Sequence, residues 1–149
     1  MQANGSNWVR SANGEAFVPQ YVMYAGPQYF RTNNELIQND INRYLGNGYG
    51  FTGLHVPVYC RWFDINQARC SDVANTNPDP ETFAALETLI RRVYYAGGTV
   101  HLWAWGDSGR LQNPTQLSSE RGVNGPADLR LQRYIAARLG PLPLSLIHI

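Results

Sequence analysis

Apolar residues follow two different periods along the chain, and their order predicts three strand–helix pairs. The runs PQYVMYA, FTGLHVPVY and TVHLWAW are short, apolar and rich in β-branched or aromatic residues, as is typical of buried strands. After each run, the segments 32–46, 79–97 and 126–140 carry apolar residues at helical spacing. Strands that alternate with helices in this way predict parallel strands joined by crossover helices.

The ends of the predicted helices carry recognisable signals. Thr32 and Glu35 have the spacing of a capping box at the start of the first helix. Asp79 followed by Pro80 gives the second helix an N-cap and a favoured first residue, and Gly97 can end it. Ahead of the first strand, WVRSANGEAFVP is typical of a β-hairpin that turns at Asn13-Gly14. The element boundaries are therefore predicted from chemistry as well as from periodicity.

The connections differ in length on the two sides of the predicted sheet. The second and third strands are each followed by loops of roughly 20 residues, whereas about 2–6 residues is usual. Functional residues in parallel α/β folds lie at the carboxyl ends of the strands. We therefore expect the functional site beside these two loops.

One face of the third strand carries side chains suited to binding. Strand alternation places His101, Trp103, Trp105 and Asp107 of HLWAWGD on the same face, and His55 of the second strand would face the same side. A buried histidine more often has a structural role, and Trp103 could be a core residue. Trp105 stands next to Gly106-Asp107 at the strand end, which favours a binding surface.

Several neighbouring residues have the chemistry of a sugar-binding cleft. Indole rings stack on the apolar faces of sugars, while carboxylates and guanidinium groups bind the hydroxyls. Asp107 and Arg110 in WAWGDSGR, and Arg61 and Trp62 in CRWFD, supply such groups. The predicted substrate-binding set is Tyr24, His55, Arg61, Trp62, Trp103, Trp105, Asp107 and Arg110.

Composition narrows the classes of partner. The 149 residues suit one domain, and a net charge of +1 without a basic run implies neither nucleic acid nor an anionic membrane as a partner. No apolar run reaches the roughly 18 residues of a membrane span, and MQANGSNW lacks the features of a signal peptide. Cys60 and Cys70 could form a disulfide or remain two separate thiols.

Other motifs give weaker indications. GNGYG follows a helix and precedes a strand, whereas a phosphate-binding loop must follow a strand, so it is a turn. His55 and His101 would lie on neighbouring strands, but two histidines alone do not support a zinc site. No metal and no cofactor is predicted.

The segments WVRSANGEAFVPQYVMYAG, GLHVPV, NPDPETFAALETLI, GGTVHLWAWGD and RYIAARLGPLP occur in this order. With them the chain resembles, from about Trp8 to Pro143, the N-terminal part of (β/α)₈-barrel glycoside hydrolases of the cellulase-like superfamily. The resemblance implies a fold class of α/β, namely a partial TIM barrel of about three β/α units preceded by a short hairpin. It also implies a carbohydrate substrate and an extracellular or periplasmic parent protein.

In that superfamily one carboxylate ends the fourth strand as the acid/base and another ends the seventh strand as the nucleophile. Neither position matches this chain, so Asp64, Asp107 and Glu120 are not assigned as catalytic, and the fragment itself is expected to be inactive. Residues 1–143 are interpreted as the barrel portion, which would need its missing C-terminal part as a partner.

The final residues, 144–149, read LSLIHI and resemble a translated sequencing adapter. We interpret them as a tail foreign to the gene, although they also have the composition of a fourth strand. Without a genuine fourth strand, the edge of the third strand would be unpaired. Two alternatives to a hydrolase fragment remain: a non-catalytic carbohydrate-binding barrel, and an open doubly wound α/β domain that binds a small molecule.

Overall fold

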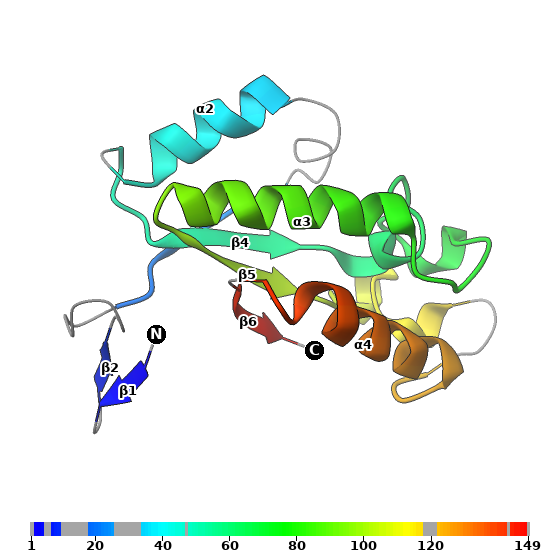
Figure 1. Cartoon of the computed structure of the whole chain (residues 1–149). Helices are drawn as coiled ribbons and strands as arrows, with labels where there is room; N and C mark the ends of the chain where they lie inside the picture. Colours follow the sequence, from blue (N-terminus) through cyan, green and yellow to red (C-terminus); the bar gives the residue numbers. More distant parts are fainter. Residues whose placement is uncertain are drawn as a thin grey trace.

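The structure, a computed structural model, describes residues 2–4, 7–9, 18–25, 34–46, 48–117, 122–142 and 144–148. A two-stranded antiparallel hairpin precedes a parallel sheet (Figure 1). The hairpin strands are β1 (Gln2–Asn4) and β2 (Asn7–Val9). The sheet has the order β3 (Tyr21–Met23), β4 (Gly53–Pro57), β5 (Thr99–Trp103) and β6 (Leu144–His148), and neighbouring strands run parallel.

Helices α2 (Asn34–Tyr44), α3 (Pro80–Tyr95) and α4 (Pro126–Leu139) follow β3, β4 and β5 in turn. The predicted α/β class with parallel strands and crossover helices is confirmed. The long connection after β4 contains the short 3₁₀ helices η1 (Tyr59–Trp62) and η2 (Cys70–Asp72). The connection after β5 contains η3 (Ser108–Arg110) and η4 (Pro114–Gln116).

One expectation about the ends of the chain falls outside the described residues, and another differs from the structure. β2 pairs with the segment before it, with Asn4 opposite Asn7, and the predicted turn at Asn13-Gly14 lies outside the described residues. The outer edge of β5 was expected to be unpaired, and this is wrong, because β6 pairs with it from Val100↔Leu144 to Trp103↔His148. Residues 144–148 therefore continue the parallel ladder.

The hydrophobic core lies between one face of the sheet and the three helices. Leu54, Val56, Val100 and Leu102 alternate along β4 and β5 and are fully buried. They form one cluster with apolar residues of all three helices, which are Ile37, Ile41, Phe83, Leu86, Leu89, Ile90, Val93, Ala127, Leu131, Ile135 and Leu139. The helices therefore cover the same face of the sheet, and Figure 1 shows α3 lying along β4 and β5.

Local chemistry explains where α3 begins and ends. The Asp79 side chain accepts hydrogen bonds from the backbone N–H groups of Glu81 and Thr82, and Pro80 follows it directly, as predicted. Beyond the helix, Gly97 has φ +80°, a left-handed conformation that favours glycine.

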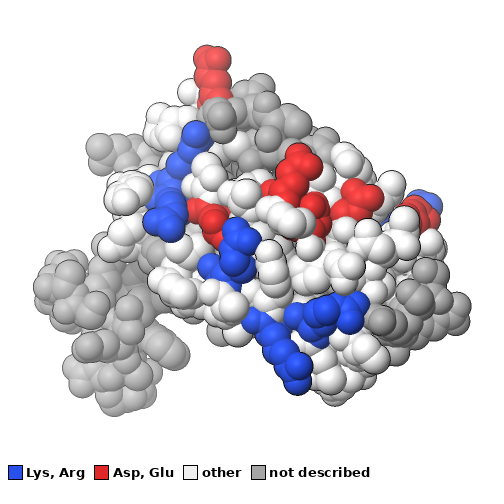
Figure 2. Space-filling view, turned by 45° about the vertical axis from the view of Figure 1, so that its right-hand side comes forward, with Lys and Arg blue, Asp and Glu red and all other residues white. Residues whose placement is uncertain are grey.

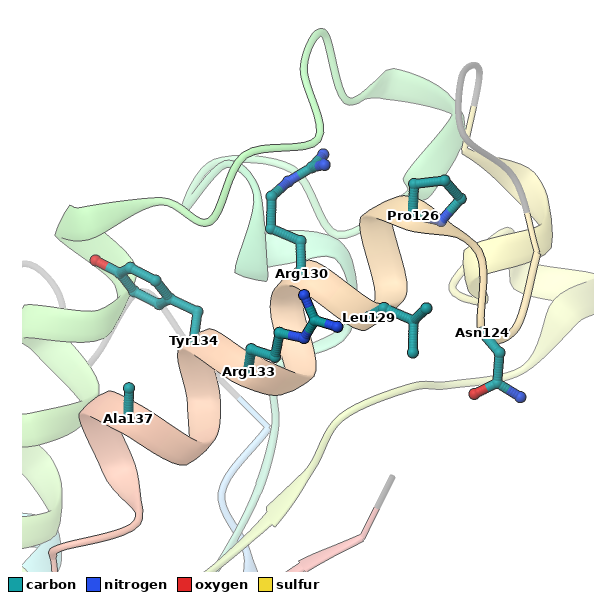
Figure 3. Close-up of a pocket in the computed structure, with 7 residues that line it drawn as sticks. All are labelled: Asn124, Pro126, Leu129, Arg130, Arg133, Tyr134 and Ala137. Atoms are coloured by element: carbon teal, nitrogen blue, oxygen red, sulfur yellow. The ribbon is translucent and has the colours of Figure 1, made fainter.

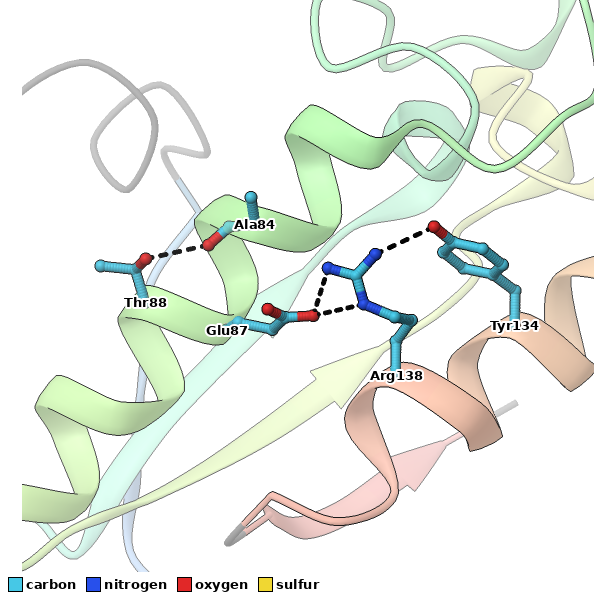
Figure 4. A network of polar contacts seen from close by, with 5 residues as sticks. All are labelled: Ala84, Glu87, Thr88, Tyr134 and Arg138. Carbon is cyan, nitrogen blue, oxygen red and sulfur yellow. Dashed lines mark hydrogen bonds and ion pairs between the residues drawn. The ribbon is translucent and has the colours of Figure 1, made fainter.

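α3 and α4 are also joined by a polar contact (Figure 4). Arg138 Nε donates to Glu87 Oε1 at 2.7 Å, and Arg138 Nη1 donates to the Tyr134 hydroxyl at 3.0 Å. The hydrogen bond to Glu87 raises the pKa of the Arg138 guanidinium. The Tyr134 ring packs edge-on against Phe83 with 4.6 Å between centroids, so the polar link borders the core.

Charges of both signs lie on the face shown in Figure 2, in keeping with the small net charge. Among the described residues, no helix has the length and apolar character needed to cross a lipid bilayer.

Candidate functional site

The two long connections meet at the carboxyl ends of β4 and β5. Val58 N–H donates to Trp103 O at 3.0 Å, which continues the ladder into the loops. Cys70 N–H then donates to Leu111 O at 2.6 Å, so η2 is tied to the loop that follows η3. Gly106 lies where the loops touch, because a Cβ atom there would come within 2.7 Å of the Tyr59 ring. The two loops therefore form one surface above the strand ends.

Cys60 and Cys70 form a disulfide, with 5.1 Å between their Cα atoms. Both side chains are fully buried. The bridge joins η1 to η2, and η1 also carries Arg61 and Trp62. Of the two alternatives that the sequence allows, the structure has the disulfide.

An aromatic and imidazole row occupies the sheet face opposite the helices. His55 pairs with His101 across the strands, and their rings meet edge-on at 4.5 Å between centroids. The Trp103 ring lies 5.3 Å from the His55 ring, also edge-on, and 36% of Trp103 is exposed. Strand alternation places His55, His101 and Trp103 together, as the sequence indicates.

A cavity of about 410 Å³ opens at the end of this row, beside β5 and the start of α4. Trp103 and Trp105 line its wall, together with Asp128 and Gln132 of α4. The described residues that line it are Trp103, Trp105, Asn113, Pro114, Val123, Asn124, Asp128 and Gln132. Apolar ring faces beside a few polar groups are typical of a small-molecule site.

The sequence interpretation missed the polar half of this cavity. Asn113 starts η4, where its side chain accepts a hydrogen bond from Thr115 N–H. Asp128 and Gln132 stand one turn apart in α4, and Gln132 Nε2 donates to Asp128 Oδ2 at 3.1 Å. The only signal in the sequence was an aspartate in the first turn of a helix, which is also a common helix-stabilising feature.

Two predicted binding residues belong to the core instead. Trp62 is fully buried, and its indole N–H donates to Ala104 O at 3.0 Å, so its one polar atom is satisfied internally. Tyr24 is 5% exposed and lies on the helix-facing side of the sheet. The register explains this, since Met23 stands opposite His55 and the next residue must face the other way. Neither side chain lines the aromatic cavity.

The remaining predicted residues lie at the strand ends but outside the cavity wall. Asp107 is exposed, and its Oδ1 accepts a hydrogen bond from Gly109 N–H at 2.8 Å, so it caps η3. Arg110 is exposed on the same 3₁₀ helix. Arg61 is half-buried on η1, and its carbonyl accepts a hydrogen bond from Thr82 Oγ1 at 2.8 Å. Trp103 and Trp105 are thus the two predicted residues that the structure brings into one cavity.

A larger cavity of about 690 Å³ runs along the outer flank of α4 (Figure 3). Its lining includes Leu129, Tyr134 and Arg133, together with Arg130, which donates to Thr76 O and Thr76 Oγ1. The described residues of its lining include no carboxylate and no indole. Among the described residues, no group of three His, Cys, Asp or Glu side chains is placed to hold a metal ion.

Comparison with known proteins shows the fold. Over 99% of its length the chain is similar to 27% of the exo-beta-1,4-mannosidase Op5Man5 from Opitutaceae bacterium strain TAV5, with a TM-score of 0.66 and 20% identity. Over 91% of its length it is similar to 34% of a GH5_18 protein from Streptomyces cattleya, solved in complex with GlcNAc, with a TM-score of 0.52 and 15% identity. No protein-family model and no curated protein matches the chain.

The chain therefore spans about a third or less of the length of these two solved structures. At this level of identity the likeness is one of fold: the strands and helices described above are arranged as in part of two glycoside hydrolases.

Proposed function

We propose that the chain is part of a glycoside hydrolase barrel and forms one side of its substrate cleft. The observation that carries the proposal is the cavity at the end of β5, whose lining includes Trp103, Trp105 and Asp128. Stacking indoles and a hydrogen-bonding carboxylate are the groups that bind sugar rings. Similarity in fold to two glycoside hydrolases supports the same assignment.

The strand order supports a barrel over a doubly wound sheet. A doubly wound sheet reverses its order at a switch point and carries helices on both faces. Here the order β3-β4-β5 within residues 1–143 contains no reversal, and α2, α3 and α4 share one core on one face. The face with His55, His101 and Trp103 would then be the inside of the barrel.

In this proposal the catalytic carboxylates belong to the rest of the parent protein, and residues 144–149 are a foreign tail. The disulfide between Cys60 and Cys70 supports an oxidising compartment, and hence an extracellular or periplasmic parent. Resequencing the source locus beyond the codon for Pro143 tests this part. A frame that continues through the remaining β/α units, with a Glu at the end of the fourth and of the seventh strand, supports the hydrolase. A natural frame that ends in LSLIHI favours the non-catalytic binding barrel.

Binding is tested on the chain itself by titration with β-1,4-mannobiose, cellobiose and N-acetylglucosamine, followed by tryptophan fluorescence and calorimetry. At least one sugar should bind, and Trp103→Ala should weaken that binding about five- to tenfold, since one stacking contact contributes on the order of 1–1.5 kcal/mol. The matched control is Tyr95→Ala, an aromatic residue 81% exposed at the end of α3. Absence of binding by all three sugars would overturn the proposal.

A further inference from the structure

The two carboxylate oxygens of Asp128 differ in their hydrogen bonds to the described residues: one accepts two, and the other accepts none. The residue is 1% exposed in the first turn of α4. Its Oδ2 accepts hydrogen bonds from Asn124 N–H at 2.8 Å and from Gln132 Nε2 at 3.1 Å. Its Oδ1 is shielded from solvent and accepts no hydrogen bond from any residue that the structure describes.

A buried carboxylate oxygen without a donor is rare, because removing it from water is costly unless a hydrogen bond replaces the lost hydration. The position of Asp128 offers a source for that donor. Asp128 lines the cavity together with Trp103 and Trp105, and a small displacement of the cavity wall would open the unused oxygen to a ligand there.

We propose that Asp128 is a specificity-determining residue of the sugar site: one hydroxyl of the bound sugar donates to Oδ1 while the ring packs against the indoles of Trp103 and Trp105. This inference rests on the proposed function. The surrounding polar groups favour a neutral hydroxylated ligand, because the amides of Asn113, Asn124 and Gln132 line the same wall and amides both donate to and accept from hydroxyls.

A carboxylate that accepts from a hydroxyl makes a charge-assisted hydrogen bond, stronger than a bond between neutral groups. Asp128 is already fixed by Asn124 and Gln132, so little rotational freedom is lost when the sugar binds. A sugar that lacks the hydroxyl leaves Oδ1 buried and unpaired, and rejection of such an analogue is correspondingly strong.

The test uses monodeoxy derivatives of whichever of the three sugars binds the wild-type chain most tightly. One derivative should lose about tenfold or more in affinity on the wild type, and Asp128→Asn should remove most of that discrimination. Asp72→Asn, an exposed aspartate of η2 outside the cavity wall, is the matched control and should keep the wild-type pattern.

The outcomes separate this inference from the proposed function. If no sugar binds, the proposed function falls and this inference with it. If sugars bind and Trp103→Ala weakens them while Asp128→Asn keeps the full deoxy pattern, only the role of Asp128 is overturned. The role of Asp128 is also overturned if Asp128→Asn lowers the melting temperature but leaves the affinities for the deoxy sugars unchanged. In that case the donor to Oδ1 comes from the chain and not from the sugar. Should Asp128→Asn not fold, equal affinity of the wild type for all deoxy derivatives would still overturn it.

Discussion

The two faces of the β4–β5 pair come from the same ten residues but are built for different surroundings. Toward the helices, Leu54, Val56, Val100 and Leu102 are fully buried, and every one is aliphatic. On the opposite face, His55 and His101 are half-buried and Trp103 is 36% exposed. Alternation along each strand makes both faces at once, so one short sequence specifies a packing surface and a chemical surface.

This difference indicates at which positions the volume of the side chain can change without loss of stability. The helix-facing residues have no room for a change of volume, because a close-packed interior cannot absorb it. The opposite face ends in a cavity, and its rings touch at their edges instead of filling a sealed core. Stability should therefore depend on the first face and ligand binding on the second.

The largest expected effect is on the helix-facing side. Leu102→Ala should lower the free energy of unfolding by about 2–5 kcal/mol, because it leaves a cavity at a fully buried position. Trp103→Ala, at the adjacent residue, should lower it by much less, since the indole is already partly in water. Urea denaturation followed by circular dichroism measures both, and equal losses would contradict the distinction between the faces.

The disulfide should have the next largest effect. Replacing Cys60 and Cys70 together by Ala should lower stability by about 3 kcal/mol, because the bridge restricts the unfolded chain. A reductant should lower the melting temperature of the wild type and leave that of the double variant unchanged. If the reductant lowers the melting temperature of both proteins equally, it does not act through this disulfide and the prediction is wrong.

The sequence predicted the elements better than the site. Asp79-Pro80 and Gly97 mark the ends of α3 through backbone chemistry that acts over a few residues, and such signals are readable without the fold. The alternation that unites His55 with Trp103 is equally local. These parts of the structure agree with the sequence because no distant contact is needed to produce them.

The predicted site residues that lie away from the cavity are placed by distant contacts. Trp62 follows a strand in sequence, but η1 turns its indole inward onto Ala104 O, a contact between residues far apart in the chain. The face of the sheet on which Tyr24 lies depends on the register between β3 and β4. Asn113, Asp128 and Gln132 enter the cavity only because the loop after β5 folds back toward α4, which no local pattern indicates.

Trp62 and Trp103 allow a sharper form of the comparison, because they are the same residue type in opposite roles. Trp62→Phe should lower stability by about 1–2 kcal/mol, since it removes the hydrogen bond and leaves Ala104 O buried. Sugar affinity, measured on the folded fraction, should stay at the wild-type value. A loss of affinity as large as that caused by Trp103→Ala would return Trp62 to the binding site.

The smallest effect is expected where α3 and α4 are joined outside both faces. Glu87→Gln removes the ion pair with Arg138. In the wild type the Glu87 side chain is 25% exposed and the Arg138 side chain is 36% exposed. Exposed pairs of this kind contribute little, and salt weakens them. The melting temperature should fall less than for Trp62→Phe, and the difference from the wild type should shrink as salt is raised.

The pH dependence of this contact follows from the pKa of Arg138. That pKa is raised in the folded state, so the stabilisation is fully present below the unfolded-state pKa of the guanidinium and is lost only as pH rises through the folded value. The difference between wild type and Glu87→Gln should therefore stay constant from neutral to moderately alkaline pH. Arg138→Met removes the charge but retains an apolar side chain beside the Tyr134 ring, so it is the matched control that separates the ion pair from side-chain packing. A pair that proved as important as Leu102 would mean that polar links, and not the apolar face of the sheet, hold the helices in place.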